Sequence, residues 1–416
     1  MKQIANTAIF ILTSMTLSGQ MLDGGNGHAI ILDHQGIVWT MGRNNYGQLG
    51  DSTLENSPIT KQVKNLINTV AISRGYDHSI ALDKNGNLFL WGRNNYGQLG
   101  CPSINDQLTP QKLTNHTNFI AAEGGHWHTI GLKEDGSVWS WGHNYFAELG
   151  NGTREHSQWP VCVLQISQAK ISLLKDVVSI ASVGYHTLAL KKDGSVWGWG
   201  SNSFNELGKK GNTVQPYAIK IEGIPRIKQI AVGWHHSVAL DYQGDIWIWG
   251  SDPAFQFEEE TRKYYDQPVL LKDLPKFTKI ACGSWHSLAI DENKNVWAWG
   301  KNHFGMLGTG DSISYSSPIL IERLKSITDI GGGCFHSMAL DTSGRIFTFG
   351  DNPSGQLGIR KIYTPTLMNF NLNTIQLARK TVQSEFTFKN LMYLLFLFSI
   401  LLNIILYRKT EYMTIF

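Results

Sequence analysis

The chain has 416 residues, of which 42 are glycine, 14 are tryptophan and 12 are proline, while charged residues make up only 17%. This composition fits many short, tightly turned strands packed on aromatic side chains, and it excludes a disordered chain, a coiled coil and a collagen-like repeat. The net charge of +3 is too small to indicate nucleic-acid binding, and no basic block occurs.

The four cysteines fit neither a CxxC spacing nor a disulfide framework. We expect four small buried thiols in a reducing compartment, at Cys101, Cys162, Cys282 and Cys334.

Residues 1–19 form an N-terminal segment with two interpretations. Lys2 and the apolar run from Ala8 to Leu12 weakly resemble a signal peptide, but threonines dilute the run and no A-x-A cleavage site follows. A strand fits the segment at least as well. Gly19–Asp23 and Thr374–Ala378 both match the innermost strand of the first repeat described below, and only one of them can take that place.

Seven histidines recur at steps of 50, 50, 58, 50, 50 and 50 residues. An apolar residue precedes each by six positions, an aromatic residue follows by eleven, and a glycine follows by fourteen. Such a period is the signature of a repeat architecture. The histidines are His28, His78, His128, His186, His236, His286 and His336.

Each repeat is predicted to form four short strands, which in the fifth repeat are Ile227–Val232, Ser237–Asp241, Asp245–Trp249 and Pro268–Leu271. A single four-stranded sheet cannot bury two apolar faces, but seven sheets in a closed ring can. The fold class is therefore all-β, with a seven-bladed β-propeller of four-stranded blades over residues 20–378.

The run GWHHSVALDYQGDIWIWG at 233–250, with NYGQLG at 45–50 and again at 95–100, resembles the regulator of chromosome condensation repeat. The resemblance covers nearly nine tenths of the chain and implies the same seven-bladed propeller. Members of this family include an exchange factor for the small GTPase Ran, a plant ultraviolet receptor, a secreted β-lactamase inhibitor and many adaptors. Fold therefore does not decide function.

The seven histidines do not suit a metal site, because one histidine per blade places them on a wide ring. We expect each to be buried and to bond to the next blade, and the repeated tryptophan to pack between blades. No catalytic motif, metal site or cofactor site is found, so an exchange factor is the most enzyme-like activity to be considered.

The two residues before each ring histidine vary between repeats, and we expect these turns to form a binding face at one mouth of the channel. Ordinary turn residues are the alternative. In the family's exchange factor, an acidic residue and a histidine at this kind of position contribute to GTPase binding, and Asp77 and His235 stand there. Flanking candidates are Trp127, Trp234 and Trp285.

Two further places break the repeat. The fifth unit has an acidic and aromatic loop at 251–266 in place of Leu-Gly, with Glu258, Glu259, Tyr264 and Tyr265 as contact candidates unless the loop is only solvated. An eight-residue insertion falls near 165–175, and one placement is between the third and fourth strands of a unit. The exchange factor's β-wedge follows the Trp-x-Trp-Gly strand of an early blade. In comparison with that wedge, the insertion is instead placed after the next strand.

Asn390–Tyr407 is a stretch of 18 uncharged, mostly apolar residues between Lys389 and Arg408. As a helix it would span about 27 Å, enough for a thin bilayer. We expect a transmembrane tail anchor here, preceded by a tether at 379–389 and followed by a short tail at 408–416.

The sequence thus predicts a monomeric, membrane-tethered propeller in the cytosol that binds a protein partner. One hypothesis is a Ran-like small GTPase, with nucleotide exchange, in the manner of effectors that bacteria deploy in host cells. The alternatives are a membrane adaptor without a GTPase and an extracytoplasmic inhibitor of the β-lactamase inhibitor type.

Overall fold

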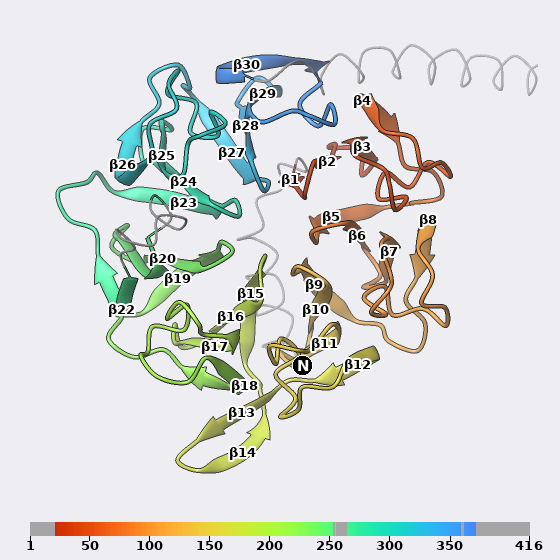
Figure 1. Cartoon of the computed structure of the whole chain (residues 1–416), viewed down its shortest axis with the longest axis vertical. Coiled ribbons are helices and arrows are strands. Elements are labelled where there is room, and N and C mark those ends of the chain that lie inside the picture. Colours follow the sequence, from red (N-terminus) through yellow and green to blue (C-terminus); the bar gives the residue numbers. More distant parts are fainter. Residues whose placement is uncertain (1–20, 253, 255–263, 359–361, 372–416) are drawn as a thin grey trace, which may run out of the picture. The chain divides into compact units, whose positions relative to one another are not determined.

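The structure, a computed structural model, describes residues 21–252, 254, 264–358 and 362–371. In this part of the chain all regular elements are strands, and they form seven sheets arranged radially about one axis (Figure 1). The predicted seven-bladed all-β propeller is confirmed. No helix in the described part has the length and apolarity to cross a bilayer. Asn390–Tyr407 lies outside it.

The strands of the first four blades follow one another along the chain, with one extra hairpin between blades three and four. Blades one and two are β1 (Met21–Gly24), β2 (His28–Leu32), β3 (Val38–Gly42), β4 (Ser57–Gln62), β5 (Thr69–Arg74), β6 (His78–Asp83), β7 (Leu88–Gly92) and β8 (Gln107–Lys112). Blades three and four are β9 (Phe119–Gly124), β10 (His128–Lys133), β11 (Val138–Gly142), β12 (Ser157–Cys162), then β15 (Val177–Ser182), β16 (His186–Lys191), β17 (Val196–Ser201) and β18 (Val214–Lys220).

The last three blades repeat the same plan without insertions. Blades five and six are β19 (Ile227–Val232), β20 (His236–Asp241), β21 (Ile246–Ser251), β22 (Tyr264–Leu270), β23 (Phe277–Cys282), β24 (His286–Asp291), β25 (Val296–Gly300) and β26 (Tyr315–Leu320). Blade seven is β27 (Ile327–Gly332), β28 (His336–Asp341), β29 (Arg345–Gly350) and β30 (Ile362–Asn371).

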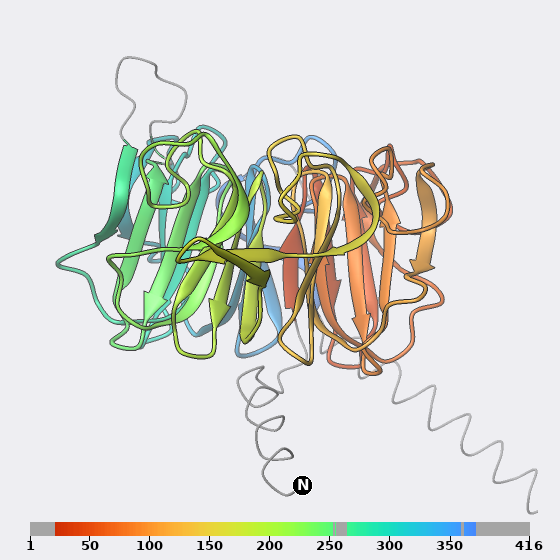
Figure 2. The ribbon, with the colours of Figure 1, turned by 90° about the horizontal axis from the view of Figure 1, so that it is seen from below.

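Within each blade the strands pair antiparallel in chain order from the axis outward. The turn between the first and second strands and the loop between the third and fourth therefore lie on one face. We call this face, uppermost in Figure 2, the mouth face. It consists of the turns at 25–27, 75–77, 125–127, 183–185, 233–235, 283–285 and 333–335 together with the third-to-fourth strand loops.

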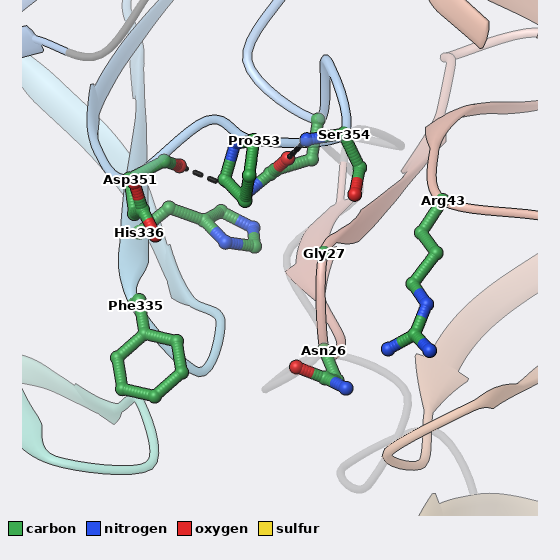
Figure 3. A pocket seen from close by; sticks show the side chains of 9 residues that line it. Asn26, Gly27, Arg43, Phe335, His336, Asp351, Pro353 and Ser354 are labelled. Atoms are coloured by element: carbon green, nitrogen blue, oxygen red, sulfur yellow. Dashed lines mark hydrogen bonds between the residues drawn. The ribbon is translucent and has the colours of Figure 1, made fainter. Parts of the chain in front are cut away.

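The inner strand of blade one is β1, which pairs with β2 through Asp23↔Ile30 and its neighbours. The competing stretch Thr374–Ala378 lies outside the described residues. Blades one and seven thus each come from one continuous stretch and meet at a seam (Figure 3), where the Cys334 amide of blade seven donates to the Gly25 carbonyl of blade one at 3.2 Å. Arg74 of blade two reaches both blades. Its Nη2 donates to the Gly332 carbonyl at 2.7 Å and its Nε to Asp23 Oδ1 at 3.2 Å.

The insertion follows the fourth strand of blade three. The placement between the third and fourth strands is therefore wrong, and the placement after the next strand is confirmed. The insertion forms a hairpin of β13 (Leu164–Ser167) and β14 (Lys170–Leu173). β13 pairs in parallel with the outer strand β18, so blade four becomes a six-stranded sheet. The outer strand of a blade has one edge that no strand of its own blade pairs, which explains why an insertion is accommodated there.

The ring histidines are buried, as predicted, and six of them contact a hydroxyl of the next blade through Nε2. In five of the six the hydroxyl belongs to the residue after the next ring histidine, as in His236 Nε2 to Ser287 Oγ at 2.9 Å. His128 instead contacts Ser182 at 3.2 Å. Blade one has Ala29 where the hydroxyl would be, and His336 Nε2 has no partner among the described residues.

The hydroxyl also joins the backbone of the two blades. Ser79 Oγ donates to the Gln48 carbonyl at 2.8 Å and Ser237 Oγ to that of Glu206 at 2.8 Å. Because the hydroxyl proton is used, the histidine Nε2 must be the protonated nitrogen in these contacts. One hydroxyl thus connects a ring histidine and a loop carbonyl of the preceding blade.

The second tryptophan of each Trp-x-Trp-Gly strand, not the first, is the fully buried one. Trp249 is 0% exposed and its Nε1 donates to the Glu206 carbonyl of blade four at 2.7 Å, whereas Trp247 is half-buried and its Nε1 donates to Asp241 at 3.1 Å. The aromatic residue eleven after the histidine also packs on the apolar clusters between blades, as predicted, with Trp197 inside one cluster and Trp247 at the edge of another. The tryptophan two residues on is the more deeply buried of the two.

The cysteines are all free thiols, but only three are buried and Cys162 is half-buried. Burial raises the pKa of Cys282 to about 12 and that of Cys334 to about 11. These two thiols are therefore unreactive at neutral pH.

We predict that Ala29→Ser stabilises the ring. A serine can give His336 Nε2 the hydroxyl it lacks and can donate to the Gln356 carbonyl, the counterpart of Gln48, which should add about 1 kcal/mol. The control Ser79→Ala removes an existing contact and should cost about 1–3 kcal/mol. Equilibrium denaturation measures both, and a neutral or destabilising Ala29→Ser would contradict the seam model.

A second prediction separates the two tryptophans of one strand. Trp249→Ala should cost about 3–5 kcal/mol, because it leaves a large cavity between blades four and five. Trp247→Ala should cost at least about 1 kcal/mol less, since part of that side chain already meets water. Denaturant titration of the two variants checks the order, and equal losses would show that both residues seal the blades.

We predict that the protein loses stability at mildly acidic pH, between about pH 6.5 and pH 4. Burial lowers the pKa of His78, His236, His286 and His336 to about 3 and that of His186 to about 4. These histidines stay neutral in the fold but take up protons near pH 6.5 when unfolded, so stability is full above pH 6.5 and falls towards pH 4. The loss is about 1.4 kcal/mol per pH unit for each histidine.

Three buried carboxyls oppose this trend. Burial raises the pKa of Glu123 to about 8 and also raises the pKa of Asp23 and of Asp77, so these groups cost stability as pH rises. The five histidines outnumber them. Tryptophan fluorescence followed from pH 7 to pH 4 should show cooperative unfolding, and a stability that stays level over this range would contradict the buried-histidine account.

Candidate functional site

In six blades the turn on the mouth face is shaped by a glycine three residues before the ring histidine, and blade four has Val183 there. A Cβ on Gly75 would lie 1.9 Å from His78 Cε1, and one on Gly233 would lie 2.0 Å from His236 Cε1. The chain therefore passes directly over the imidazole without a side chain. The next two residues of each turn lie on the mouth face.

An aromatic cluster centred on His126 occupies this face. Ring centroids of His126 lie 4.2 Å from Tyr76, 4.1 Å from Trp127, 4.8 Å from Tyr185 and 5.1 Å from Trp234. Burial lowers the pKa of His126 to about 3, so it is a neutral ring at pH 7. The turns of blades two to five thus meet across the mouth of the channel.

The cluster continues into blade six. Trp234 lies 4.7 Å from Trp285, and His235 lies 5.9 Å from Trp285. Trp285 is only 6% exposed, so it supports the cluster from below. The structure therefore brings together Trp127, Trp234, His235 and Trp285, as the sequence predicted, with Tyr76, His126 and Tyr185 between them.

Asp77 is at the predicted position but is only 2% exposed. It lies between two guanidinium groups, 3.3 Å from Arg93 Nη1 and 3.9 Å from Arg43 Nη1. Burial raises the pKa of Asp77, and both arginines oppose that shift. Arg93 also lies over the rings of Tyr46 at 4.7 Å and Trp127 at 5.4 Å. A partner would therefore meet the arginines of this pair before the carboxylate.

His235 belongs to a second polar pair. Its Nδ1 lies 3.4 Å from Oε1 of Glu206, and its ring lies 4.1 Å from Phe204. Burial acts to raise the pKa of Glu206, but the contacts with His235 outweigh it and the pKa is lowered. The equivalent pair in blade three is His143 Nδ1 and Glu148 Oε1, 2.7 Å apart. Both carboxylates stand where blades one and two have Gln48 and Gln98.

A second tier of aromatic residues lies in the third-to-fourth strand loops, and the sequence analysis missed it. The signal was present in the NYGQLG repeat, because an aromatic residue follows the ring histidine by eighteen positions in five blades. These residues are Tyr46, Tyr96, Phe146, Phe204 and Phe304. Each of the last four lies near the turn residue of the next blade, with ring distances between 4.1 and 5.3 Å.

The loop of blade five is described only at its ends. Tyr264 begins β22, is 39% exposed and lies 6.0 Å from the Phe204 ring. Tyr265 is half-buried, and burial raises the pKa of its hydroxyl. The two tyrosines therefore border the mouth-face cluster, whereas Glu258 and Glu259 lie outside the described residues.

The site offers aromatic surface for recognition. Among the residues that the structure describes, no group of histidine, cysteine and acidic side chains could hold a metal ion. The ring histidines are separated by blades and are engaged with hydroxyls. What the mouth face presents is aromatic area with two partly exposed arginines, the composition found where proteins bind proteins.

Solved structures share this fold at low identity. Human WBSCR16 is 20% identical, with a TM-score of 0.69 over 80% of this chain and 93% of that one. Prp20p from Saccharomyces cerevisiae, described with its binding properties to Gsp1p and histones, is 20% identical with a TM-score of 0.69 over 85% of this chain and 88% of that one. Yeast RCC1 (Prp20) bound to Kap60 gives the same identity and TM-score over 85% of each chain.

The family comparison covers the whole propeller. The family model described as RCC1-like domain matches residues 13–278 and, in an overlapping second match, 113–388. These ranges contain every described strand, the ring histidines and the mouth-face turns. The chain therefore belongs to the RCC1-like domain family.

Proposed function

We propose that the protein binds a small GTPase of the Ran type on its mouth face and promotes nucleotide exchange. The observation that carries this is the continuous aromatic and arginine surface built from the turns of blades two to six. Its kinship with Prp20p, which binds Gsp1p, adds support. Interface energy concentrates in a few central aromatic and arginine residues, and this surface holds both.

The route to exchange would differ from that of a β-wedge. The hairpin β13–β14 extends the outer edge of blade four and lies between the two faces of the propeller (Figure 2). Exchange would therefore depend on the mouth-face residues themselves, above all the arginines around Asp77 and the pair of His235 and Glu206. An adaptor without exchange activity would use the same surface. Only the rate of nucleotide release from the bound GTPase distinguishes the two functions.

We predict that Trp234→Ala weakens GTPase binding at least about thirty-fold, which corresponds to about 2 kcal/mol. Trp159→Ala is the matched control, because that tryptophan is 44% exposed on the outer strand β12. Asp77→Ala should lower the exchange rate more than the affinity, since it releases Arg43 and Arg93 from their shared carboxylate. Fluorescent-GDP release and titration with GDP-loaded, GTP-loaded and nucleotide-free GTPases measure these quantities.

The outcomes distinguish the candidate functions. Binding without accelerated GDP release by the wild type would leave the adaptor function. Binding that Trp159→Ala weakens as much as Trp234→Ala would move the interface away from the mouth face. No binding in any nucleotide state would eliminate the GTPase proposal.

We also propose that Asn390–Tyr407 tethers the propeller to a membrane from the cytosolic side. Its support is the run of 18 uncharged residues between basic flanks. Deleting residues 390–416 should move the protein from the carbonate-washed membrane pellet to the supernatant, as immunoblotting of the two fractions would show. A truncated protein that stays in the pellet would contradict the proposed anchor.

A further inference from the structure

The hairpin of β13 and β14 gives blade four an outer edge unlike those of the other six blades. The fourth strand of every blade contains a proline, namely Pro58, Pro110, Pro160, Pro216, Pro268, Pro318 and Pro365. Proline has no N–H group, so it is one of the residues that keep an outer strand from pairing with other chains. In blade four, however, β14 lies outside β18 and β13, and β14 contains no proline.

The turn of the hairpin determines which backbone groups of β14 face outward. Ser167 pairs with Lys170 across the two-residue turn 168–169, whose φ values of +48° and +62° are those a type I′ turn requires. The pair that flanks such a turn is hydrogen-bonded, and bonded and non-bonded pairs then alternate along the ladder. Ile171 and Leu173 therefore belong to non-bonded pairs, so their N–H and C=O groups point away from β13.

This outward edge is open to solvent. All four residues of β14 are exposed, and in the described part of the chain β13 is the only strand that pairs with β14. Two N–H groups and two C=O groups in a row, at the spacing of a strand, can pair with the backbone of another extended chain.

The side chains on one face of the hairpin are aliphatic. Residues directly opposite each other in a ladder share a face, as do residues two apart in one strand. One face therefore carries four side chains, which we call the apolar strip: Leu164, Ile166, Ile171 and Leu173. The last two are 49% and 43% exposed. The other face is held to blade four, where Lys191 Nζ donates to Gln165 Oε1 at 2.6 Å.

Charge also narrows the choice of partner. Residues 164–175 contain two lysines, Lys170 and Lys175, one at each end of β14, and no acidic residue. Asp176, the next carboxylate along the chain, interacts with Lys191. Antiparallel pairing of two copies would bring Lys170 of one beside Lys175 of the other, which disfavours a dimer through this edge. A lipid surface cannot bond to the free N–H and C=O groups.

We propose that the outer edge of β14 binds an extended segment of a partner protein, which adds a strand to the sheet of blade four. Apolar side chains at alternate positions of this segment would cover the apolar strip, and acidic residues at its ends would meet the two lysines. The edge lies on the side of the propeller, between its two faces (Figure 2). It is therefore separate from the mouth face and does not rest on the proposed function.

The test uses the full-length protein and the fluorescein-labelled peptide EEVTVTVEE, titrated by fluorescence anisotropy. The same peptide N-methylated at its five central residues cannot donate backbone hydrogen bonds, so it should bind at least about tenfold more weakly, or by about 1.4 kcal/mol. The peptide KKVTVTVKK should also bind more weakly, because like charges face each other at both ends of the strand.

Two protein variants locate the site. Leu173→Pro gives β14 the protection that the other outer strands have, and it should weaken binding of EEVTVTVEE at least about tenfold. Ile171→Glu keeps the backbone donor but removes part of the apolar strip and repels the acidic peptide, so it should also weaken binding. Ile59→Glu is the matched control, because Ile59 is 73% exposed on β4, whose edge carries Pro58, and binding should be unchanged.

Hydrogen exchange distinguishes strand addition from non-specific apolar contact. Saturating peptide should slow exchange of the Ile171 and Leu173 amides, which should be fast in the free protein. The proposal is overturned if EEVTVTVEE does not bind, if its N-methylated form binds as tightly, if the variants bind as Ile59→Glu does, or if exchange at these amides does not change. Slow exchange in the free protein would mean that the chain itself or a second copy already covers the edge, and would also overturn it.

Discussion

One hydroxyl in each of blades two to seven joins that blade to the preceding one. It accepts a hydrogen bond from a ring histidine of the preceding blade, and in Ser79, Ser237 and their counterparts it donates to a loop carbonyl of that same blade. The imidazoles are buried, so protonating one would place a charge between two apolar sheets. The fold thus depends on small polar contacts placed where two apolar sheets meet, and these contacts set which residues can occupy the turns above them.

The mouth face follows from this constraint. Because glycine lies over the imidazole in six of the seven blades, with Val183 in blade four, the two residues between this position and the histidine are the ones free to vary. Blades two to six use them for Tyr76, Trp127, Tyr185 and Trp234, which gather around His126, and for Trp285, which contacts Trp234. A rigid repeat therefore presents a variable surface, and recognition can change without disturbing the packing between blades.

Much of this could be predicted from sequence, because strict spacing reports directly on a repeated structure. The ring histidines, seven blades and gathering of Trp127, Trp234 and His235 all follow from fixed offsets. The burial of Asp77 could not be predicted in this way. Its position marks it as a turn residue, but two arginines from neighbouring loops enclose its side chain. The sequence left two placements open for the hairpin β13–β14, since an insertion shows its length in the sequence but not the sheet edge it joins. The loop aromatics were visible at a fixed offset, but their role appears only when neighbouring blades are brought together.

The seam between blades one and seven lies between complete blades, and this affects how the number of blades can change during evolution. Blade one begins with β1 and blade seven ends with β30, so each blade corresponds to one uninterrupted piece of the coding sequence. Duplicating or deleting a segment of one period would add or remove a complete blade and leave no strand without its partners. Only the contacts across the closing junction, such as the Cys334 amide with the Gly25 carbonyl, would have to form anew.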